Sequence, residues 1–279
     1  MEAGESQFIT WPVEPALRPY VNRIVGFREA GAAVLRREPL MVGCPMLFVF
    51  GAPYQLSERA APSVLSVTHG SFMAGVFDSF TMSRPTGPTE GLQIDLSPLG
   101  ARILTGVPMH EFANLIVPMQ DLWGREMRDV QERLGNLDTW DERFRLIEAA
   151  LLARLRSRPG PAREVAWAWN QLVTAHGDMR ISVLTDELQW SRKRLRHAFL
   201  RDIGFSPKLM ARMLRYCHAV AMARAEPGTG WSQIAQRAGY SDQAHLHRDV
   251  RAFAGTTPAA LRTELREETF VQAAHGAEP

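Results

Sequence analysis

Residues 234–248 read IAQRAGYSDQAHLHR, and this stretch decides how the second half of the chain folds. A short apolar segment ends at Gly239, a tyrosine and a serine follow, and the apolar residues Leu246 and Val250 then recur four positions apart. A short helix, a tight turn and a second helix that packs on the first make up a helix-turn-helix unit. The stretch therefore predicts such a unit over about residues 231–254.

The chain carries the same pattern a second time, 50 residues earlier. Residues 184–191 read LTDELQWS and align with IAQRAGYS at 234–241, whereas the apolar residues that follow align at an offset of 51. This repeat predicts a first unit over about residues 181–204, with a turn one residue shorter than that of the second unit. Ser191 and Ser241 each suit the N-cap of the next helix, because a serine oxygen accepts from the exposed N–H groups there.

A single helix is predicted between the two units, over Pro207 to Ala225, because its apolar residues fall on one stripe. A helix of this size is roughly 28 Å long at about 1.5 Å per residue. Successive major grooves on one face of B-DNA recur every ~34 Å. A stiff helix of this length therefore suits two DNA-reading helices held at its two ends.

Basic residues concentrate around the first unit. Between Ser191 and Arg215 stand eight Lys and Arg residues against one acid, Asp202. The whole chain has a net charge of only +2, with 16 Arg and 18 acidic residues in 1–160 but 16 basic and 12 acidic residues in 161–279. Such a concentrated field favours a polyanionic partner, because each neutralised phosphate releases counterions. A solvated helix face explains the charge, taken by itself, equally well.

The first 96 residues predict strands rather than helices. An apolar run at 46–50 is stopped by turn residues, and residues 91–96 alternate with period two. Ser97 and Pro98 suit a helix start, and helical periodicity continues to Arg158. The fold class predicted is α+β, with the following boundaries: an N-terminal domain at 1–158 that is β-rich over 11–96 and helical over 97–158, a linker at 159–161, and an all-α domain at 162–268.

The repeated units resemble the signature of the AraC/XylS family of bacterial transcriptional regulators. The resemblance is most specific over residues 234–248, continues through Gly255-Thr256-Thr257-Pro258 and Leu261-Arg262, and covers about residues 165–265. It implies a seven-helix DNA-binding domain with two helix-turn-helix units, joined to a cupin-like domain for effector sensing or oligomerisation. It also implies double-stranded DNA and RNA polymerase as partners, a small-molecule effector, a homodimer and activation of transcription.

The resemblance, together with the polar outer faces of the second helices, implies which residues contact DNA. Arginine can bond guanine bidentately and glutamine can bond adenine. The residues expected to read bases are Lys193, Arg196, His197, Gln243, Ala244, His247 and Arg248. Those expected to contact phosphates are Arg192, Arg194, Lys208 and Arg212.

Three departures from the family's pattern occur within the units. Gln189 stands where the family usually has glycine at the turn, and a left-handed conformation is disfavoured for other residues. Asp249 places an acid beside the expected reading face of the second unit. Val250 and Ala254 replace positions that are often aromatic in the family. All three departures bear on how well each unit reads DNA.

Aromatic residues of the β-rich part suit a binding pocket for a small apolar effector, although ordinary core residues have the same composition. The residues expected to line that pocket are Phe48, Phe50, Phe72, Met73 and Phe77. Arg23 and Arg28, close to Tyr20, suit either an anionic ligand or an exposed surface. No metal and no cofactor are expected, because His69 and His110 stand far apart and no cysteine cluster is present.

The sequence thus predicts a sequence-specific DNA-binding transcription regulator, responsive to an effector, that inserts two recognition helices into successive major grooves. Two alternatives stay open: a protein-binding adaptor with degenerate units, supported by Gln189 and Asp249, and a fused enzyme that uses Cys44 as a nucleophile. No enzyme is expected, since Cys44 lacks a neighbouring motif. No apolar run or leader stretch indicates a membrane partner or export, so a cytoplasmic, nucleoid-associated location is expected.

Overall fold

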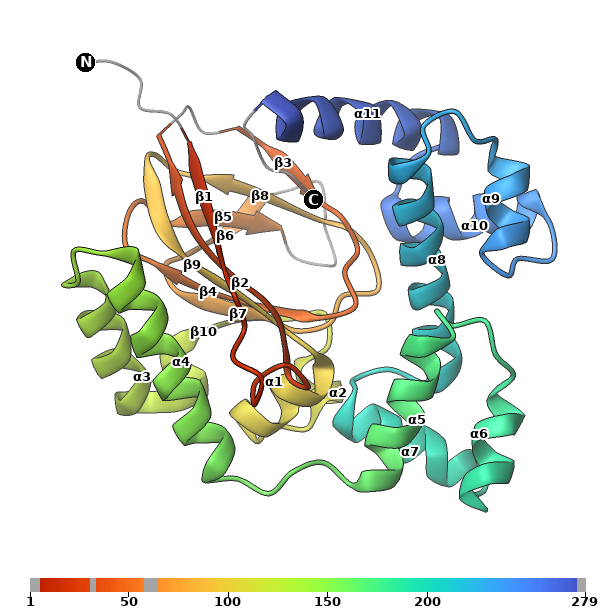
Figure 1. The fold of residues 1–279 in the computed structure, drawn as a ribbon, viewed down its shortest axis with the longest axis horizontal. Helices are drawn as coiled ribbons and strands as arrows, with labels where there is room; N and C mark the ends of the chain where they lie inside the picture. The colour runs from red at the N-terminus through yellow and green to blue at the C-terminus, as the bar shows by residue number, and fades with distance from the viewer. Residues whose placement is uncertain (1–5, 31–33, 58–64, 275–279) are drawn as a thin grey trace.

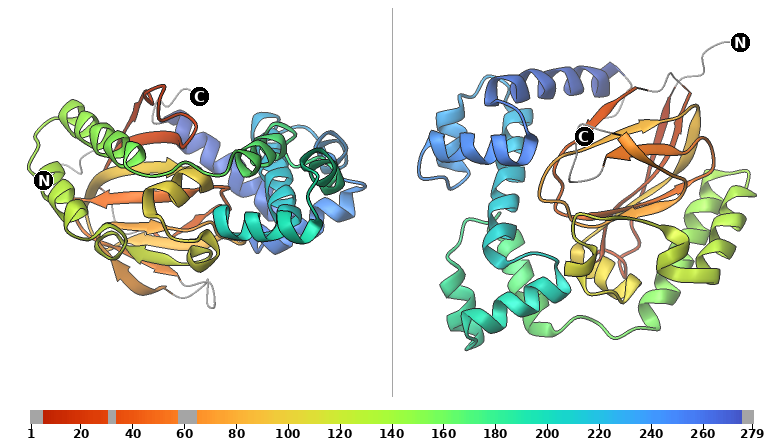
Figure 2. Two further views of the ribbon diagram at one scale, coloured as in Figure 1. Left: turned by 90° about the horizontal axis from the view of Figure 1, so that it is seen from below. Right: turned by 180° about the vertical axis from the view of Figure 1, so that it is seen from behind.

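The computed structural model describes residues 6–30, 34–57 and 65–274, and within these ranges the chain forms a β-rich half and a helical half (Figure 1). The β-rich half comes first and is followed by helices that cover one side of it. The second half is helical and stands beside the sheets (Figure 2). The predicted fold class, a β-rich domain with trailing helices followed by an all-α domain, is confirmed.

The β-rich half contains two antiparallel sheets. The first has the order β1-β2-β9-β4-β7-β10 and the second the order β3-β8-β5-β6. The strands of the first sheet are β1 (Gln7–Trp11), β2 (Val21–Glu29), β4 (Cys44–Val49), β7 (Phe72–Ala74), β9 (Thr89–Leu96) and β10 (Ile116–Pro118). Those of the second are β3 (Arg36–Glu38), β5 (Tyr54–Ser57), β6 (Leu65–His69) and β8 (Thr81–Pro85).

The central strands of the first sheet are buried on both faces, and successive side chains point to opposite faces. Phe48 of β4 is fully buried in the same apolar cluster as Phe144 of a covering helix, whereas its neighbour Leu47 packs with Tyr54 and other residues between the sheets. The helices of this half are α1 (Pro98–Thr105), α2 (Met109–Phe112), α3 (Met119–Gly135) and α4 (Trp140–Arg156). A Cβ at Gly26 of β2 would lie 2.6 Å from Trp140, so only glycine lets α4 approach this closely.

Two predicted boundaries in this half are wrong. The first strand begins at Gln7 rather than near residue 11, and β10 interrupts the span 97–158 that was predicted to be helical. In β10 Ile116 and Val117 are β-branched and Pro118 lacks an N–H, so the segment favours an edge strand, and it pairs with β7. The predicted helix start is confirmed, because Ser97 Oγ accepts from the Gly100 N–H at 3.1 Å.

The described part of the C-terminal half contains seven helices, as predicted. They are α5 (Arg163–Thr174), α6 (Ile181–Leu188), α7 (Arg192–Asp202), α8 (Pro207–Ala225), α9 (Trp231–Arg237), α10 (Gln243–Ala254) and α11 (Pro258–Ala274). The predicted helix over Pro207 to Ala225 is confirmed as α8. In Figure 1, α6 and α7 lie at one end of α8 and α9 and α10 at the other.

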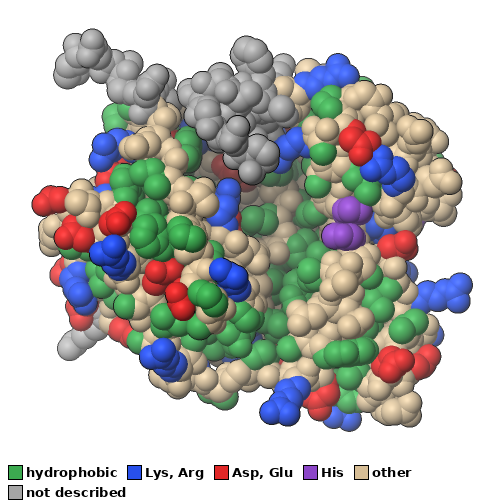
Figure 3. Space-filling view, in the orientation of Figure 1, with side chains coloured by type: hydrophobic (Ala, Val, Ile, Leu, Met, Phe, Trp, Pro, Cys, Tyr) green, Lys and Arg blue, Asp and Glu red, His purple; other side chains and the backbone are tan. Residues whose placement is uncertain are grey.

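The two halves contact each other directly. The N–H of Phe80, just before β8, donates to the Phe253 carbonyl of α10 at 2.9 Å, and Arg37 Nη1 donates to the Ala254 carbonyl at 3.2 Å. At the other end of α8, Arg102 of α1 pairs with the buried Asp202 of α7 at 3.4 Å. The hollow between the halves is floored mainly by hydrophobic side chains (Figure 3). The β-rich half therefore touches both helix-turn-helix units.

Candidate nucleic-acid interface

The second helix of the first unit is α7, and its local sequence explains its position. Ser191 caps it, with Oγ accepting from the Arg194 N–H at 3.2 Å, while Leu195 and Phe199 are fully buried against the rest of the unit. The predicted base-reading residues of this helix, Lys193, Arg196 and His197, are all exposed on the opposite side. Packing thus leaves a polar, basic face directed to solvent.

The second helix of the second unit is α10, and its cap differs from the prediction. Asp242, not Ser241, is the N-cap residue, and its Oδ1 accepts from the His245 N–H at 2.6 Å. The cap follows the left-handed residue of the turn by three positions here and by two in the first unit, which agrees with the one-residue difference that the repeat predicted. An aspartate suits this place, because its charge also interacts favourably with the helix dipole.

The exposed face of α10 holds three of the four residues predicted to read bases there. Gln243, Ala244 and Arg248 are exposed, whereas His247 is half-buried with its Nε2 3.2 Å from Gln243 Nε2. Arg251 is exposed one turn after Arg248 and was not predicted. Its spacing of three from Arg248 places it on the same side of the helix, which is the signal that identifies it.

The turns of the two units adopt the same backbone conformation with different residues. Gly239 has φ +76°, and a Cβ there would lie 2.3 Å from Asp178 Cγ. Gln189 has φ +52°, and its Nε2 donates to the Asp186 carbonyl at 2.6 Å. In the first turn a residue other than glycine thus takes the left-handed conformation, and its side chain makes an additional hydrogen bond. The first unit is therefore complete despite the missing glycine.

The packing of α10 on α8 bears on two expectations about charge. Asp249 is 1% exposed and lies beneath α10 rather than beside its outer face. Arg212 was expected to contact phosphate, but its Nη2 lies 2.6 Å from Asp249 Oδ1. Tyr240 donates to the other carboxylate oxygen of Asp249 at 3.2 Å, and burial together with Asp249 raises the pKa of Tyr240. Arg212 therefore has a structural partner.

The other residues expected to contact phosphate remain available at the surface. Arg192, Arg194 and Lys208 are exposed, and the Arg194 guanidinium lies over the Trp190 ring at 4.2 Å from its centroid. This cation–π contact orients the guanidinium beside the N-terminus of α7. Trp190, which the sequence pattern identified only as a turn aromatic, thus positions a basic group.

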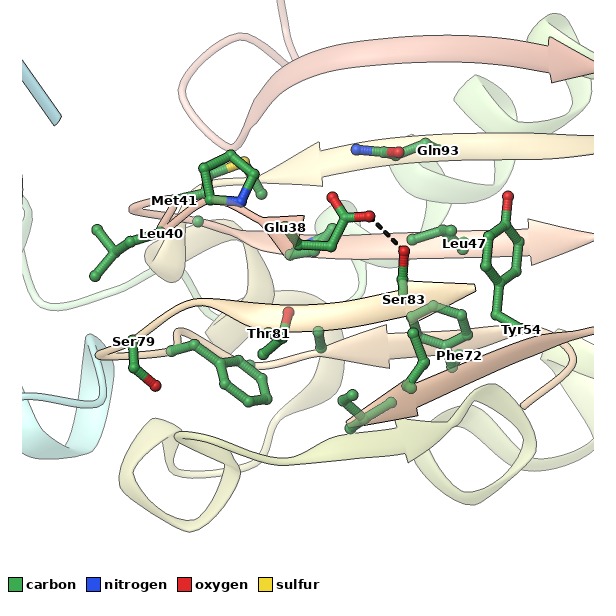
Figure 4. Close-up of a pocket in the computed structure, with 18 of the residues that line it drawn as sticks. Glu38, Leu40, Met41, Leu47, Tyr54, Phe72, Ser79, Thr81, Ser83 and Gln93 are labelled. Carbon is green, nitrogen blue, oxygen red and sulfur yellow. Dashed lines mark hydrogen bonds between the residues drawn. The ribbon is translucent and has the colours of Figure 1, made fainter. Parts of the chain in front are cut away.

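A cavity of about 250 Å³ lies between the two sheets of the β-rich half (Figure 4). Phe72 and Phe77 line it, as predicted. Phe48 and Met73 do not, because both are fully buried on the face of the first sheet that the helices cover, and Phe50 instead lies 5.0 Å from the Arg143 guanidinium. The pocket lining predicted from these three residues is therefore wrong.

The two arginines near Tyr20 have different surroundings. Arg23 lines the cavity and pairs with Asp95 at 2.8 Å, whereas Arg28 pairs with Glu90 at 2.7 Å and does not line it. The pKa of Glu90 is lowered by its hydrogen bonds to Arg28 and Arg143, although burial opposes that shift. Both arginines thus have carboxylate partners within the domain.

Neither cysteine lies in a setting that activates a thiol. Burial raises the pKa of Cys44, and it raises the pKa of Cys217 to about 12. A nucleophilic cysteine requires the opposite shift. Over the described ranges, no group of three His, Cys, Asp or Glu residues is placed to hold a metal ion. No helix in that same part of the chain has the length and apolarity to cross a membrane.

The C-terminal half is a helix-turn-helix domain with two units at the ends of one long helix. Residues 184–264 match the family model described as a helix-turn-helix domain. The matched residues run from α6 into α11, so they include both helix-turn-helix units. No curated protein sequence matches the chain.

Solved structures of ToxT from Vibrio cholerae are similar to the chain at low identity. A 1.65 Å structure in the P21 form is 11% identical over 93% of this chain and 98% of that one, with a TM-score of 0.48. ToxT from strain SCE256 with a bound unsaturated fatty acid is 10% identical over 94% of this chain and 96% of that one, with a TM-score of 0.48. The class of the domain therefore rests on the helix-turn-helix match and on the geometry of the two units.

Proposed function

We propose that the chain is a sequence-specific transcription regulator of the AraC/XylS type, in which α7 and α10 enter successive major grooves of one DNA duplex. The observation that carries this proposal is the pair of capped helices with exposed polar faces at opposite ends of α8. A helix of 19 residues gives a strut of roughly 28 Å at about 1.5 Å per residue, near the groove spacing.

Contacts made by the first half of α8 support a fixed spacing of the two units. Arg212 pairs with Asp249 of α10, and Arg215 Nη1 donates to the Gly239 carbonyl in the second turn at 3.2 Å. Near the first unit, a Cβ at Gly177 would lie 2.0 Å from the Ala211 carbonyl oxygen, which indicates close backbone packing of the preceding loop on α8. A rigid strut favours a bipartite site over two independent half-sites.

The proposed roles follow from exposure. Lys193, Arg196 and His197 on α7 would read bases, as would an α10 set of Gln243, Ala244, His247 and Arg248. Arg192, Arg194 and Lys208 would bind phosphates, and Arg212 is no longer included. Each phosphate contact makes the slope of log affinity against log salt concentration more negative by about 0.9. Binding should therefore weaken steeply as the salt concentration rises.

The contacts between the halves support a response to an effector. Residues 37–43 line the cavity at several positions and also reach the helical half, where the Cys217 Sγ lies 3.6 Å from the Leu40 carbonyl oxygen. We place the domain boundary in the linker at 159–161, with the sensor domain at 1–158 and the DNA-binding domain at 162–268. RNA polymerase contact, a homodimer and a cytoplasmic location are further parts of the proposal that rest on the family resemblance.

The adaptor alternative has lost its two supports. Asp249 is buried beneath α10, and Gln189 adopts the turn conformation that glycine has in the second unit. The enzyme alternative needs a reactive Cys44, whose pKa is raised by burial. The DNA-binding regulator therefore accounts for more of the geometry than either alternative.

A charge-reversal experiment tests this function. Arg196→Glu/Arg248→Glu should lower the affinity for a fluorescent 30-base-pair duplex of mixed sequence at least tenfold and flatten its salt dependence, because both residues lie on the exposed faces of α7 and α10. The matched control is Arg133→Glu/Arg145→Glu, which makes the same charge change on α3 and α4. Equal loss in both variants would reject the assigned reading faces.

A further inference from the structure

The cavity between the sheets has mainly apolar walls. Leu47 and Phe72 contribute from the first sheet and Leu56 from the second, and its volume of about 250 Å³ is just below the usual size of ligand pockets. A ligand of this size would carry about one ring. The apolar walls would stabilise such a ring by removing it from water.

One carboxylate that lines this cavity, that of Glu38, is exposed and forms no ion pair with the described residues. Glu38 of β3 lines it, and Glu38 Oε1 accepts from the Ser83 hydroxyl at 2.5 Å (Figure 4). Within the described part of the chain, no lysine or arginine forms an ion pair with Glu38. A second acid nearby, Glu29, pairs with Arg36 at 2.6 Å, but its other oxygen, Oε2, is buried without a hydrogen-bond partner.

The arginine that lines the cavity does not offset this negative charge. Arg23 is paired with Asp95, whose second oxygen accepts from Gln93 at 2.7 Å. The described charges at this site are therefore two ion pairs and the carboxylate of Glu38, which interacts with Arg36 electrostatically but forms no ion pair. A ligand carboxylate would be repelled by Glu38, whereas a ligand cation would be attracted to it.

Aromatic side chains stand beside the unpaired carboxylate. Tyr54 and Phe72 both line the cavity, with their ring centroids 6.4 Å apart in an edge-to-face arrangement. The face of an aromatic ring attracts a cation. Burial and the nearby Glu29 raise the pKa of Tyr54, so its hydroxyl remains neutral. An acid flanked by aromatic rings is the surrounding that a protonated amine requires.

We propose that this cavity binds a small molecule that carries a protonated amine on an apolar body of about one ring. The amine donates to Glu38, and the body packs against Leu47 and Phe72. The role of this molecule as an effector rests on the proposed function, but its binding does not. Arg37, which precedes Glu38 in β3, holds the end of α10 through the Ala254 carbonyl, so a ligand on Glu38 acts on a strand that touches the second unit.

The test compares three probes of similar shape that differ in charge: 2-phenylethylamine, 2-phenylethanol and 3-phenylpropionate. Isothermal titration calorimetry at pH 7, with the full chain and no DNA, should show the amine binding at least tenfold more tightly than the alcohol. The carboxylate should bind most weakly. Glu38→Gln should lower the amine affinity at least tenfold and leave the alcohol within twofold, whereas the matched control Glu132→Gln on α3 should change neither.

A second variant keeps the proposal testable if Glu38→Gln does not fold. Leu47→Trp fills the cavity from the first sheet and leaves Glu38 in place, so it should abolish binding of both the amine and the alcohol. A carboxylate probe that binds as well as the amine, unchanged amine affinity in Glu38→Gln, or no binding by any of the three overturns the proposal. None of these outcomes alters the DNA-binding measurement above, which contains no small molecule.

Discussion

Arg212 on α8 and Asp249 on α10 form the ion pair that joins the strut to the second recognition helix, with Nη2 and Oδ1 2.6 Å apart. The aspartate is 1% exposed and the arginine side chain 37% exposed, so the pair lies at the edge of the core. The guanidinium also lies 5.3 Å from the centre of the Phe253 ring. The position of α10 on α8 thus depends on a buried charge.

Removing the arginine alone should destabilise the protein. Arg212→Leu leaves Asp249 buried without its cation, and we expect a loss of about 2 kcal/mol, less than for a fully buried pair because Arg212 is partly exposed. The double variant Arg212→Leu/Asp249→Leu should recover most of that loss. Thermal unfolding followed by circular dichroism measures both. Arg248→Leu is the control, and an equal effect there would contradict this role of Arg212.

Exchanging the turn residues should have opposite effects in the two units. Gln189→Gly removes a side chain from a left-handed position and should stabilise the protein by about 0.5 kcal/mol, since one hydrogen bond is also lost. Gly239→Gln should destabilise it by at least about 1 kcal/mol, because the new Cβ clashes with the Asp178 side chain. Chemical denaturation measures the difference. Destabilisation of similar size by both changes would argue against the equivalence of the two turns.

The N-cap of α10 can be identified by comparing two adjacent residues. Asp242→Ala should cost about 1 kcal/mol because it removes the acceptor of the His245 N–H, whereas Ser241→Ala should cost much less. Hydrogen exchange of the first turn of α10 should rise only in the aspartate variant. A larger effect of Ser241→Ala would restore the cap that the sequence repeat predicted.

Acidification should weaken the contact between α8 and the segment that precedes α6 through His218. Its ring stacks on His176 with centroids 4.0 Å apart, and its pKa is lowered by burial and then by His176 and Arg237. The unfolded chain therefore binds a proton more readily, so this contribution is fully present above about pH 6.5 and decreases as the pH falls below it. The melting temperature of His218→Gln should depend less on pH between 7 and 5 than that of the original chain. Identical pH dependence would contradict this assignment.

Much of the helical half could be predicted from the sequence because its signals are local. Pro207 and the turn after Ala225 bound α8, and the repeated apolar spacing located both units. The partner of Asp249 could not be predicted in this way, because Arg212 lies 37 positions away on another helix. The same applies to the ion pair of Asp202 with Arg102, which comes from the other half of the chain.

The cavity lining shows a different limit. Alternation along β4 establishes that Leu47 and Phe48 point to opposite faces, but both faces of that sheet are buried and apolar. The sequence therefore does not show which face meets the second sheet and which meets the helices. Glu38 carried no signal at all, since a charged residue in a short strand is typical of an exposed edge.

The central claim, that α7 and α10 together read one bipartite duplex site, is tested most directly by selecting bound duplexes from a random library with the purified full-length protein near physiological salt. We predict enrichment of a motif in two parts about one helical turn apart, which Arg196→Glu/Arg248→Glu loses and Arg133→Glu/Arg145→Glu retains. If the full chain enriches nothing, the selection is repeated with residues 160–279. Failure of both to enrich a two-part motif, or an enriched motif that survives in the Arg196/Arg248 variant, would contradict the account.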